Sequence, residues 1–129
     1  MGVFDVTLQI ANPVTPDRAS SLQLMVDTGA TLSSMPRPFL QSIGVSPGMT
    51  RAFLLADGRR VYRATGSVLA TIDGVTMPIP VMFADENDTP VLGATALEIL
   101  GFAVDPIAKK LVPRDLLALR ANCYLEIDS

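Results

Sequence analysis

Residues 22–30 of the chain read Leu-Gln-Leu-Met-Val-Asp-Thr-Gly-Ala. Apolar side chains recur at every second position up to Val26, which is the pattern of a strand with one buried face. Asp27 follows this strand directly. A carboxylate at the end of a buried strand must be hydrogen-bonded, paired or protonated, because burying it alone is too costly. Gly29 lets the backbone turn sharply, so we expect a tight turn that holds Asp27 in place.

Length and composition predict one folded domain. The chain has 129 residues, 49% of them apolar, which is enough for a hydrophobic core. We expect a single domain over residues 1–129, with a core from about residue 3 to 113 and a C-terminal extension over residues 114–129. No apolar run approaches the roughly 18 residues of a membrane helix. The first residues lack a signal-peptide pattern, so we expect a cytoplasmic location and no membrane segment.

The absence of histidine narrows the possible chemistry. Without histidine, Ser-His-Asp catalysis, Cys-His catalysis and zinc sites with His ligands are excluded. Cys123 is the single cysteine, so thiolate clusters are excluded too. The Gly-rich sequences that bind nucleotide phosphates are also missing. A net charge of −3 argues against nucleic acid as a partner. Carboxylates remain for acid–base chemistry, and we expect no metal and no other cofactor.

Short strands separated by frequent turns dominate the rest of the sequence. Asp-Gly pairs at residues 57–58 and 73–74 lie between β-prone runs and predict two hairpins. A third hairpin is predicted over residues 102–112. Helical patterns are short and cover residues 38–43 and 94–100. We therefore expect an all-β fold, closed or folded over, with one or two short helices.

Two further details of the strands can be predicted. Gly66 is expected to mark a bend. Pro78 and Pro80 lie two positions apart, so their missing N–H groups would face the same edge. We therefore expect their strand to lie at the edge of a sheet or to be a strand entrance, not to lie in its centre.

The order of these features resembles the retroviral-type, or retropepsin-like, aspartic proteases, the half-length relatives of pepsin. An apolar strand precedes Asp27-Thr28-Gly29-Ala30, a glycine-tipped hairpin follows, and Val91-Leu92-Gly93 then opens a helix. The resemblance covers roughly residues 8–112. It implies a closed acid-protease β-barrel and an aspartic endopeptidase that cleaves extended polypeptides. It also implies a homodimer, in which two copies of Asp27 form one active site and activate a water molecule.

The resemblance assigns a role to each matching residue of the turn. Asp27 would be the catalytic carboxylate. Thr28 would form a hydrogen-bonded lock across the dimer beneath the two carboxylates. Gly29 would bind the substrate backbone, and Ala30 would complete the active-site turn.

The hairpin and the later glycine motif receive roles in the same way. Residues Ala56, Asp57 and Gly58 would form the flap that closes over the peptide. The substrate pocket would involve the motif Val91-Leu92-Gly93, with Val91 lining it and the other two residues packing behind the catalytic turn.

The sequence departs from the viral pattern at two positions. Viral enzymes usually carry Asp after Asp-Thr-Gly-Ala and Arg after the second glycine, whereas this chain has Thr31 and Ala94. Both members of that pair are missing together, so the dimer contacts must differ from the viral ones. The chain is closer in these features to cellular and bacterial members, and residues 123–127 are expected to contribute a strand to the interface.

Other interpretations stay open. The domain could be a protease-like dimer that binds extended peptides without cutting them, or a generic β domain with a structural turn. The four arginines Arg51, Arg59, Arg60 and Arg63 favour a solvated hairpin, with a preference for acidic peptides as the alternative. The acidic residues at 85, 86 and 88 favour a solvated loop over a calcium site, because they supply too few ligands. Cys123 is expected to be a buried apolar residue.

Overall fold

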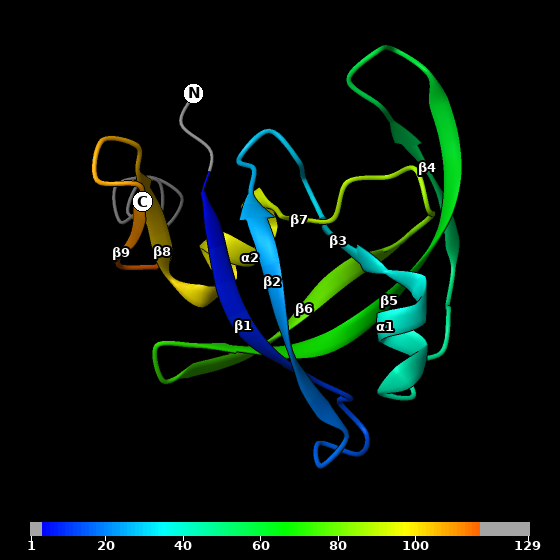
Figure 1. The fold of residues 1–129 in the computed structure, drawn as a ribbon, viewed down its shortest axis with the longest axis horizontal. Helices are drawn as coiled ribbons and strands as arrows, with labels where there is room; N and C mark the ends of the chain where they lie inside the picture. Colours follow the sequence, from blue (N-terminus) through cyan, green and yellow to red (C-terminus); the bar gives the residue numbers. More distant parts are fainter. Residues whose placement is uncertain (1–3, 117–129) are drawn as a thin grey trace, which may run out of the picture.

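The computed structural model describes residues 4–116, which form nine strands and two short helices (Figure 1). The strands are β1 (Asp5–Ala11), β2 (Ala19–Val26), β3 (Ser33–Pro36), β4 (Thr50–Leu54), β5 (Arg60–Ile72), β6 (Val75–Ala84), β7 (Val91–Leu92), β8 (Phe102–Asp105) and β9 (Lys110–Pro113). The helices are α1 (Arg37–Ser42) and α2 (Ala94–Leu100). The predicted all-β fold with two short helices is confirmed.

Seven strands form one sheet in the order β1-β2-β7-β3-β6-β5-β4, and β8 pairs with β9 separately. Strand β1 also pairs with β5, with Ile10 opposite Ala70, so the sheet folds back on itself. The hairpin of β4 and β5 extends away from the rest of this sheet (Figure 1). Residues of this hairpin and of the segment that follows β2 line one groove, and we call this side of the fold the open face.

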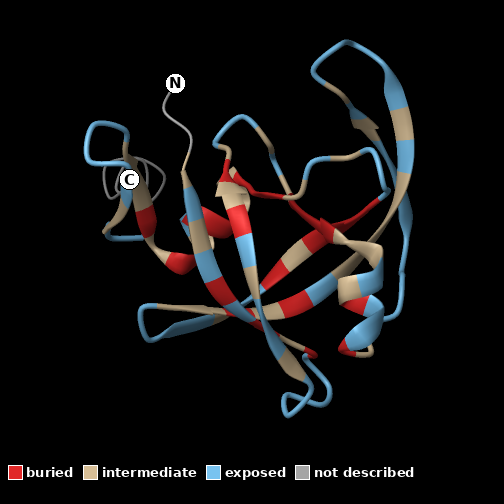
Figure 2. Ribbon diagram, viewed as in Figure 1, coloured by how far each residue is buried: buried red, intermediate tan, exposed pale blue. Residues whose placement is uncertain are grey.

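Alternation along the strands builds the core. Leu8 and Ile10 of β1 and Leu24 and Val26 of β2 are buried, while the residues between them are exposed or half-buried. Phe83 on β6 is fully buried in the same cluster. Figure 2 shows buried residues through the centre of the fold and exposed residues along the projecting hairpin. The core therefore packs against the strand that leads to Asp27, whereas β4 of the hairpin has no buried residue.

Backbone conformation explains the turns and the helix end that were predicted. Asp73 and Gly74 both have positive φ, 49° and 80°, which is the conformation that a two-residue hairpin turn requires. Gly58 also has a positive φ, 88°, within the longer connection between β4 and β5. Helix α2 ends at Gly101, whose left-handed backbone lets its N–H reach the carbonyl groups of Leu97 and Glu98.

The prediction of a bend at Gly66 is wrong. Strand β5 runs without interruption through this residue. A Cβ atom added to Gly66 would lie 3.0 Å from the ring of Phe83, so the glycine allows the close packing of β5 on a core aromatic side chain.

The prediction for Pro78 and Pro80 holds over only part of their strand. Within residues 4–116, the segment of β6 that carries both prolines pairs with β5 alone. Over residues 81–84, β6 also pairs with β3 and lies inside the sheet. The strand is therefore an edge where the prolines lie and central beyond them, which the proline spacing alone does not indicate.

Two expectations concern the ends of the chain and possible membrane helices. The interface strand predicted at residues 123–127 lies outside the described residues. Neither helix within residues 4–116 is long and apolar enough to cross a membrane.

Candidate active site

Asp27 lies in a turn that begins directly after β2. Its backbone N–H donates to the carbonyl of Leu92 at 3.0 Å, which joins the turn to β7. One carboxylate oxygen, Oδ1, accepts the N–H of Gly29 at 2.9 Å, and the N–H of Ala30 donates to the carbonyl of Asp27 at 3.2 Å. Asp27 as a whole residue is half-buried, and the hydrogen bond to its carboxylate is exposed. The predicted tight turn after β2 is therefore present, and hydrogen bonds hold the carboxylate at the open face.

Gly93 packs directly beneath this turn. A Cβ atom at this position would lie 2.7 Å from the carbonyl oxygen of Leu32 and 2.8 Å from that of Ala30. The N–H of Gly93 donates to Ser33 Oγ at 3.0 Å, and Ser33 is fully buried. Glycine is needed here for space, since its φ of −96° is open to any residue. Ser33 therefore belongs to the site, although nothing in the sequence alone indicates this role.

Helix α2 also holds the turn from below. The N–H of Ala94 donates to the carbonyl of Ala30 at 2.7 Å, and the N–H of Thr95 donates to the carbonyl of Thr31 at 3.1 Å. Thr31 and Ala94 are the two positions where the sequence departs from the viral pattern. In this chain they take part in backbone hydrogen bonds between the turn and the start of α2.

Strand β7 brings Val91 to the open face. Ser34 Oγ accepts the N–H of Val91 at 3.2 Å and donates to the carbonyl of Thr89, also at 3.2 Å. Val91 lines the groove described below, whereas Leu92 is fully buried in the core. Of the three residues predicted around the substrate pocket, only Val91 therefore reaches the groove, and Leu92 and Gly93 lie behind it.

The turn between β4 and β5 is exposed and bonded within itself. The N–H of Leu55 donates to the carbonyl of Arg59 at 2.8 Å, and Asp57 pairs with Arg59, Oδ2 to Nε, at 2.8 Å. The backbone N–H of Arg59 and then its side chain lower the pKa of Asp57. Ala56 and Asp57 line the groove, and Gly58 provides the positive φ of the turn. The three residues predicted as a flap thus lie at the tip of a projecting hairpin.

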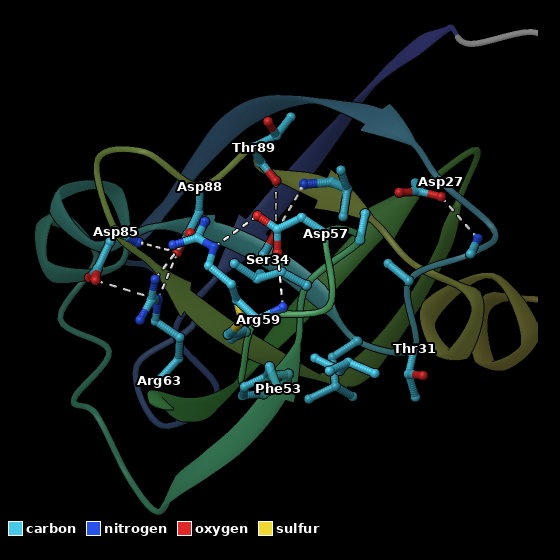
Figure 3. Close-up of a pocket in the computed structure, with 18 of the residues that line it drawn as sticks. Asp27, Thr31, Ser34, Phe53, Asp57, Arg59, Arg63, Asp85, Asp88 and Thr89 are labelled. Atoms are coloured by element: carbon cyan, nitrogen blue, oxygen red, sulfur yellow. Dashed lines mark hydrogen bonds and ion pairs between the residues drawn. The ribbon is translucent and has the colours of Figure 1, made fainter. Parts of the chain in front are cut away.

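A groove of about 1140 Å³ runs between the Asp27 turn and this hairpin. In Figure 3, Asp27 lies at one end, Asp57 and Arg59 lie between, and Arg63 with Asp85 lies at the other end. Apolar side chains from several elements complete the lining; among them are Met25, Phe53 and Met82. A groove with a carboxylate at one end and mixed polar and apolar walls can hold an extended chain.

The prediction of a solvated acidic loop after β6 holds for Asp85 and Glu86, which are exposed, but not for Asp88. Arg63 donates from Nε to Asp88 Oδ2 at 2.8 Å and from Nη2 to Oδ1 at 3.1 Å, and Asp85 lies 3.4 Å from Nε. The side chain of Asp88 is only 10% exposed. The hydrogen bonds from Arg63 lower the pKa of Asp88, and those to Asp88 raise the pKa of Arg63. Within residues 4–116 no cluster of side chains is suited to hold a metal ion.

Comparison with known proteins agrees with this geometry. The aspartyl protease family matches residues 13–96, more than half of the chain. The fold is similar to that of EIAV protease, solved in complex with the inhibitor HBY-793, with a TM-score of 0.55 and 18% sequence identity over 84% of this chain and 91% of the other. It is also similar to a retropepsin-like aspartic protease from Rickettsia conorii, with a TM-score of 0.50 and 18% identity over 80% and 86% of the two chains.

No curated protein matches the sequence. The family match includes the Asp27 turn, the hairpin and the glycine motif at residues 91–93, and the structural matches extend over most of the chain. This chain therefore belongs to the aspartyl protease family and has a retropepsin-like fold.

Proposed function

We propose that this chain is an aspartic endopeptidase whose active site forms when two copies of Asp27 meet in a homodimer. The observation that carries the proposal is the position of Asp27, which is fixed at one end of a groove of about 1140 Å³. The sequence contains a single Asp-Thr-Gly, so a second carboxylate of the same kind must come from another copy.

Two carboxylates held close together would account for catalysis. They cannot both ionise easily, so the pair shares one proton and titrates as a unit. The ionised Asp27 takes a proton from a water molecule, whose oxygen attacks the carbonyl carbon of the peptide. The protonated Asp27 of the other copy donates its proton to the carbonyl oxygen. The tetrahedral intermediate then collapses, the C–N bond breaks, and a proton passes to the leaving nitrogen.

The remaining residues of the site would serve this reaction as the resemblance implies. Gly29 would bind the backbone of the substrate near the carboxylate. Thr28 would form the lock between the two copies. The hairpin tip at residues 56–58 would close over the peptide and exclude water, while Val91 contacts a substrate side chain.

The first experiment compares peptide cleavage by the wild type, Asp27→Asn and Asp73→Asn across acidic to neutral pH. Asp73 is a matched control, because it lies in an exposed turn away from the groove and asparagine tolerates a positive φ. We expect Asp27→Asn to lose at least about a thousandfold in kcat and Asp73→Asn to retain wild-type activity, because only the first change removes the group that activates water. Equal cleavage by all three proteins would contradict the assignment of Asp27.

A mixing experiment tests whether the site is shared. Asp27→Asn protein is added in increasing excess to a fixed amount of wild type, with exchange of subunits followed by native mass spectrometry. A shared site predicts that cleavage falls as mixed dimers form. Unchanged cleavage, or cleavage by a protein that remains monomeric, would contradict the shared site. Folded dimers that bind peptides and never cut them would support the peptide-binding alternative.

A further inference from the structure

The ion pair between Arg63 and Asp88 joins two parts of the groove that are far apart in the sequence. Arg63 lies on β5, in the strand that returns from the hairpin tip. Asp88 lies in the loop between β6 and β7. Two parallel hydrogen bonds, 2.8 Å and 3.1 Å long, connect the guanidinium and the carboxylate. Such a two-point contact fixes the orientation of both groups as well as their separation.

Burial distinguishes this pair from the other ion pair of the hairpin. The side chains of Arg63 and Asp88 are 16% and 10% exposed, whereas those of Arg59 and Asp57 are 71% and 55% exposed. An exposed pair is weakened by water and salt, and a largely covered pair is weakened much less. The Arg63–Asp88 contact is therefore the more persistent link.

The neighbours of Arg63 explain why a carboxylate partner is needed there. Arg63 lies directly opposite Arg51 in the β4–β5 pairing. Like charges at opposite positions on paired strands destabilise the sheet. Asp88, with Asp85 at 3.4 Å, offsets the charge of Arg63 and so lets both arginines stay in the hairpin.

Asp88 is in turn fixed within its own loop. Its Oδ2 accepts the N–H of Asp85 at 2.8 Å, and its N–H donates to the carbonyl of Asp85 at 3.0 Å. The next residue, Thr89, is held by Ser34, which also accepts the N–H of Val91. A continuous chain of contacts thus runs from the hairpin through Asp88 to the wall of the groove.

We propose that Arg63 and Asp88 are positioning residues that set the distance between the hairpin and the loop of residues 85–90, and through it the width of the peptide groove. This inference rests on the proposed peptidase function. In Figure 3, the pair lies at the end of the groove away from Asp27, so it acts on peptide binding and not on the bond that is cut.

The test is a double-mutant cycle with Arg63→Met, Asp88→Asn and the double variant, using a peptide that the wild type cleaves. We expect each single variant to raise KM about three- to tenfold with kcat within about twofold, since the groove is loosened while the Asp27 turn is unchanged. The double variant should be no worse than either single variant, because no unpaired charge is left behind. Arg63→Lys keeps the positive charge but cannot make the two parallel hydrogen bonds to Asp88, so its KM should lie between those of the wild type and Arg63→Met.

Matched controls are Arg60→Met and Asp73→Asn. Arg60 is on the same strand, packs over the ring of Tyr62 and does not line the groove, and Asp73 lies in the distant β5–β6 turn. Both controls should retain wild-type KM. All variants are assayed well below their unfolding temperatures, so that a loss of folded protein cannot imitate a change in KM.

Two results would overturn the inference. One is a fall in kcat at unchanged KM, and the other is strictly additive effects of the two substitutions. If the wild type does not cleave any peptide, the same cycle is measured as peptide Kd by fluorescence anisotropy. Non-additive weakening of Kd would then support the inference while the proposed peptidase function fails. Absence of peptide binding by the wild type would contradict both.

Discussion

Backbone hydrogen bonds to β7 and α2 hold the turn that carries Asp27, whereas the turn of the β4–β5 hairpin, within residues 4–116, bonds only within itself. The first turn lies over Gly93 and the buried Ser33. The second has exposed residues at its tip, and apart from its chain neighbours a Cβ added to Gly58 would have no other atom of residues 4–116 within 4 Å. Regions with few buried contacts open at low free energy, and densely bonded regions do not. One side of the groove thus holds a carboxylate in a densely bonded turn, and we expect the hairpin side to open at a lower free energy.

The largest expected effect on the free energy of unfolding comes from filling the space beneath the Asp27 turn. Gly93→Ala places a Cβ within 2.8 Å of two backbone carbonyl oxygens, so the turn or α2 must shift. We expect a loss of about 3 kcal/mol in the free energy of unfolding, because overpacking against backbone cannot be relieved by a side-chain rotation. Urea unfolding followed by circular dichroism measures this loss.

Gly58→Ala is the matched change on the hairpin side. A Cβ there would contact nothing within 4 Å, but the φ of 88° is strained for alanine. We expect a loss of about 1 kcal/mol. If both variants lose the same free energy, the two sides of the groove are equally well packed and the contrast between them is wrong.

Local patterns in the sequence are sufficient to predict the elements around the Asp27 turn. The apolar strand before Asp27, the glycine at 29 and the glycine motif at 91–93 are short-range signals, and each falls in the element that was expected. The Asp-Gly pair at residues 73–74 likewise predicted its hairpin, since few residues other than glycine accept a positive φ easily.

Contacts between distant segments could not be predicted in this way. Arg63 and Asp88 are 25 positions apart, and neither position carries a local signal of pairing. Ser33 is fully buried although serine is usually exposed, and its Oγ accepts the N–H of Gly93, a residue 60 positions away. The close packing of Gly66 on the ring of Phe83 cannot be predicted either, because Phe83 lies on another strand. In each case the missing information is the pairing of strands, which local patterns do not contain.

An intermediate effect on the free energy of unfolding is expected from the ion pair between Arg63 and Asp88. The pKa of Asp88 is lowered mainly by its hydrogen bonds from Arg63, so the folded state binds this proton less readily than the unfolded state does. The resulting stabilisation is full above the pKa of an unfolded aspartate and is lost as pH falls through the lower pKa of the folded state. We expect Asp88→Asn to lose about 1 kcal/mol at neutral pH and little at strongly acidic pH.

Urea unfolding of the wild type and Asp88→Asn across this pH range provides the measurement. Asp73→Asn is the control, because no ion pair involving Asp73 is found within residues 4–116. A difference between wild type and Asp88→Asn that stays constant down to acidic pH would mean that the ion pair contributes nothing and that the substitution acts through packing alone.

The smallest effect is expected from Arg51 at the base of the hairpin. Arg51 lines the groove, and within residues 4–116 it has no ion-pair partner, unlike Arg59 and Arg63. An acidic side chain of a bound peptide can therefore pair with it. We expect Arg51→Gln to lower kcat/KM by about twofold for a peptide with Glu along the groove, relative to the same peptide with Gln, because exposed ion pairs are weak.

Arg60→Gln provides the comparison on the same hairpin, since Arg60 packs over Tyr62 and does not line the groove. Its Glu-to-Gln preference should equal that of the wild type. Added salt should remove the preference of the wild type and leave Arg51→Gln unchanged, because salt screens exposed charges. An identical preference in wild type and Arg51→Gln would mean that Arg51 does not pair with the peptide, and that the hairpin contacts it through backbone and apolar groups instead.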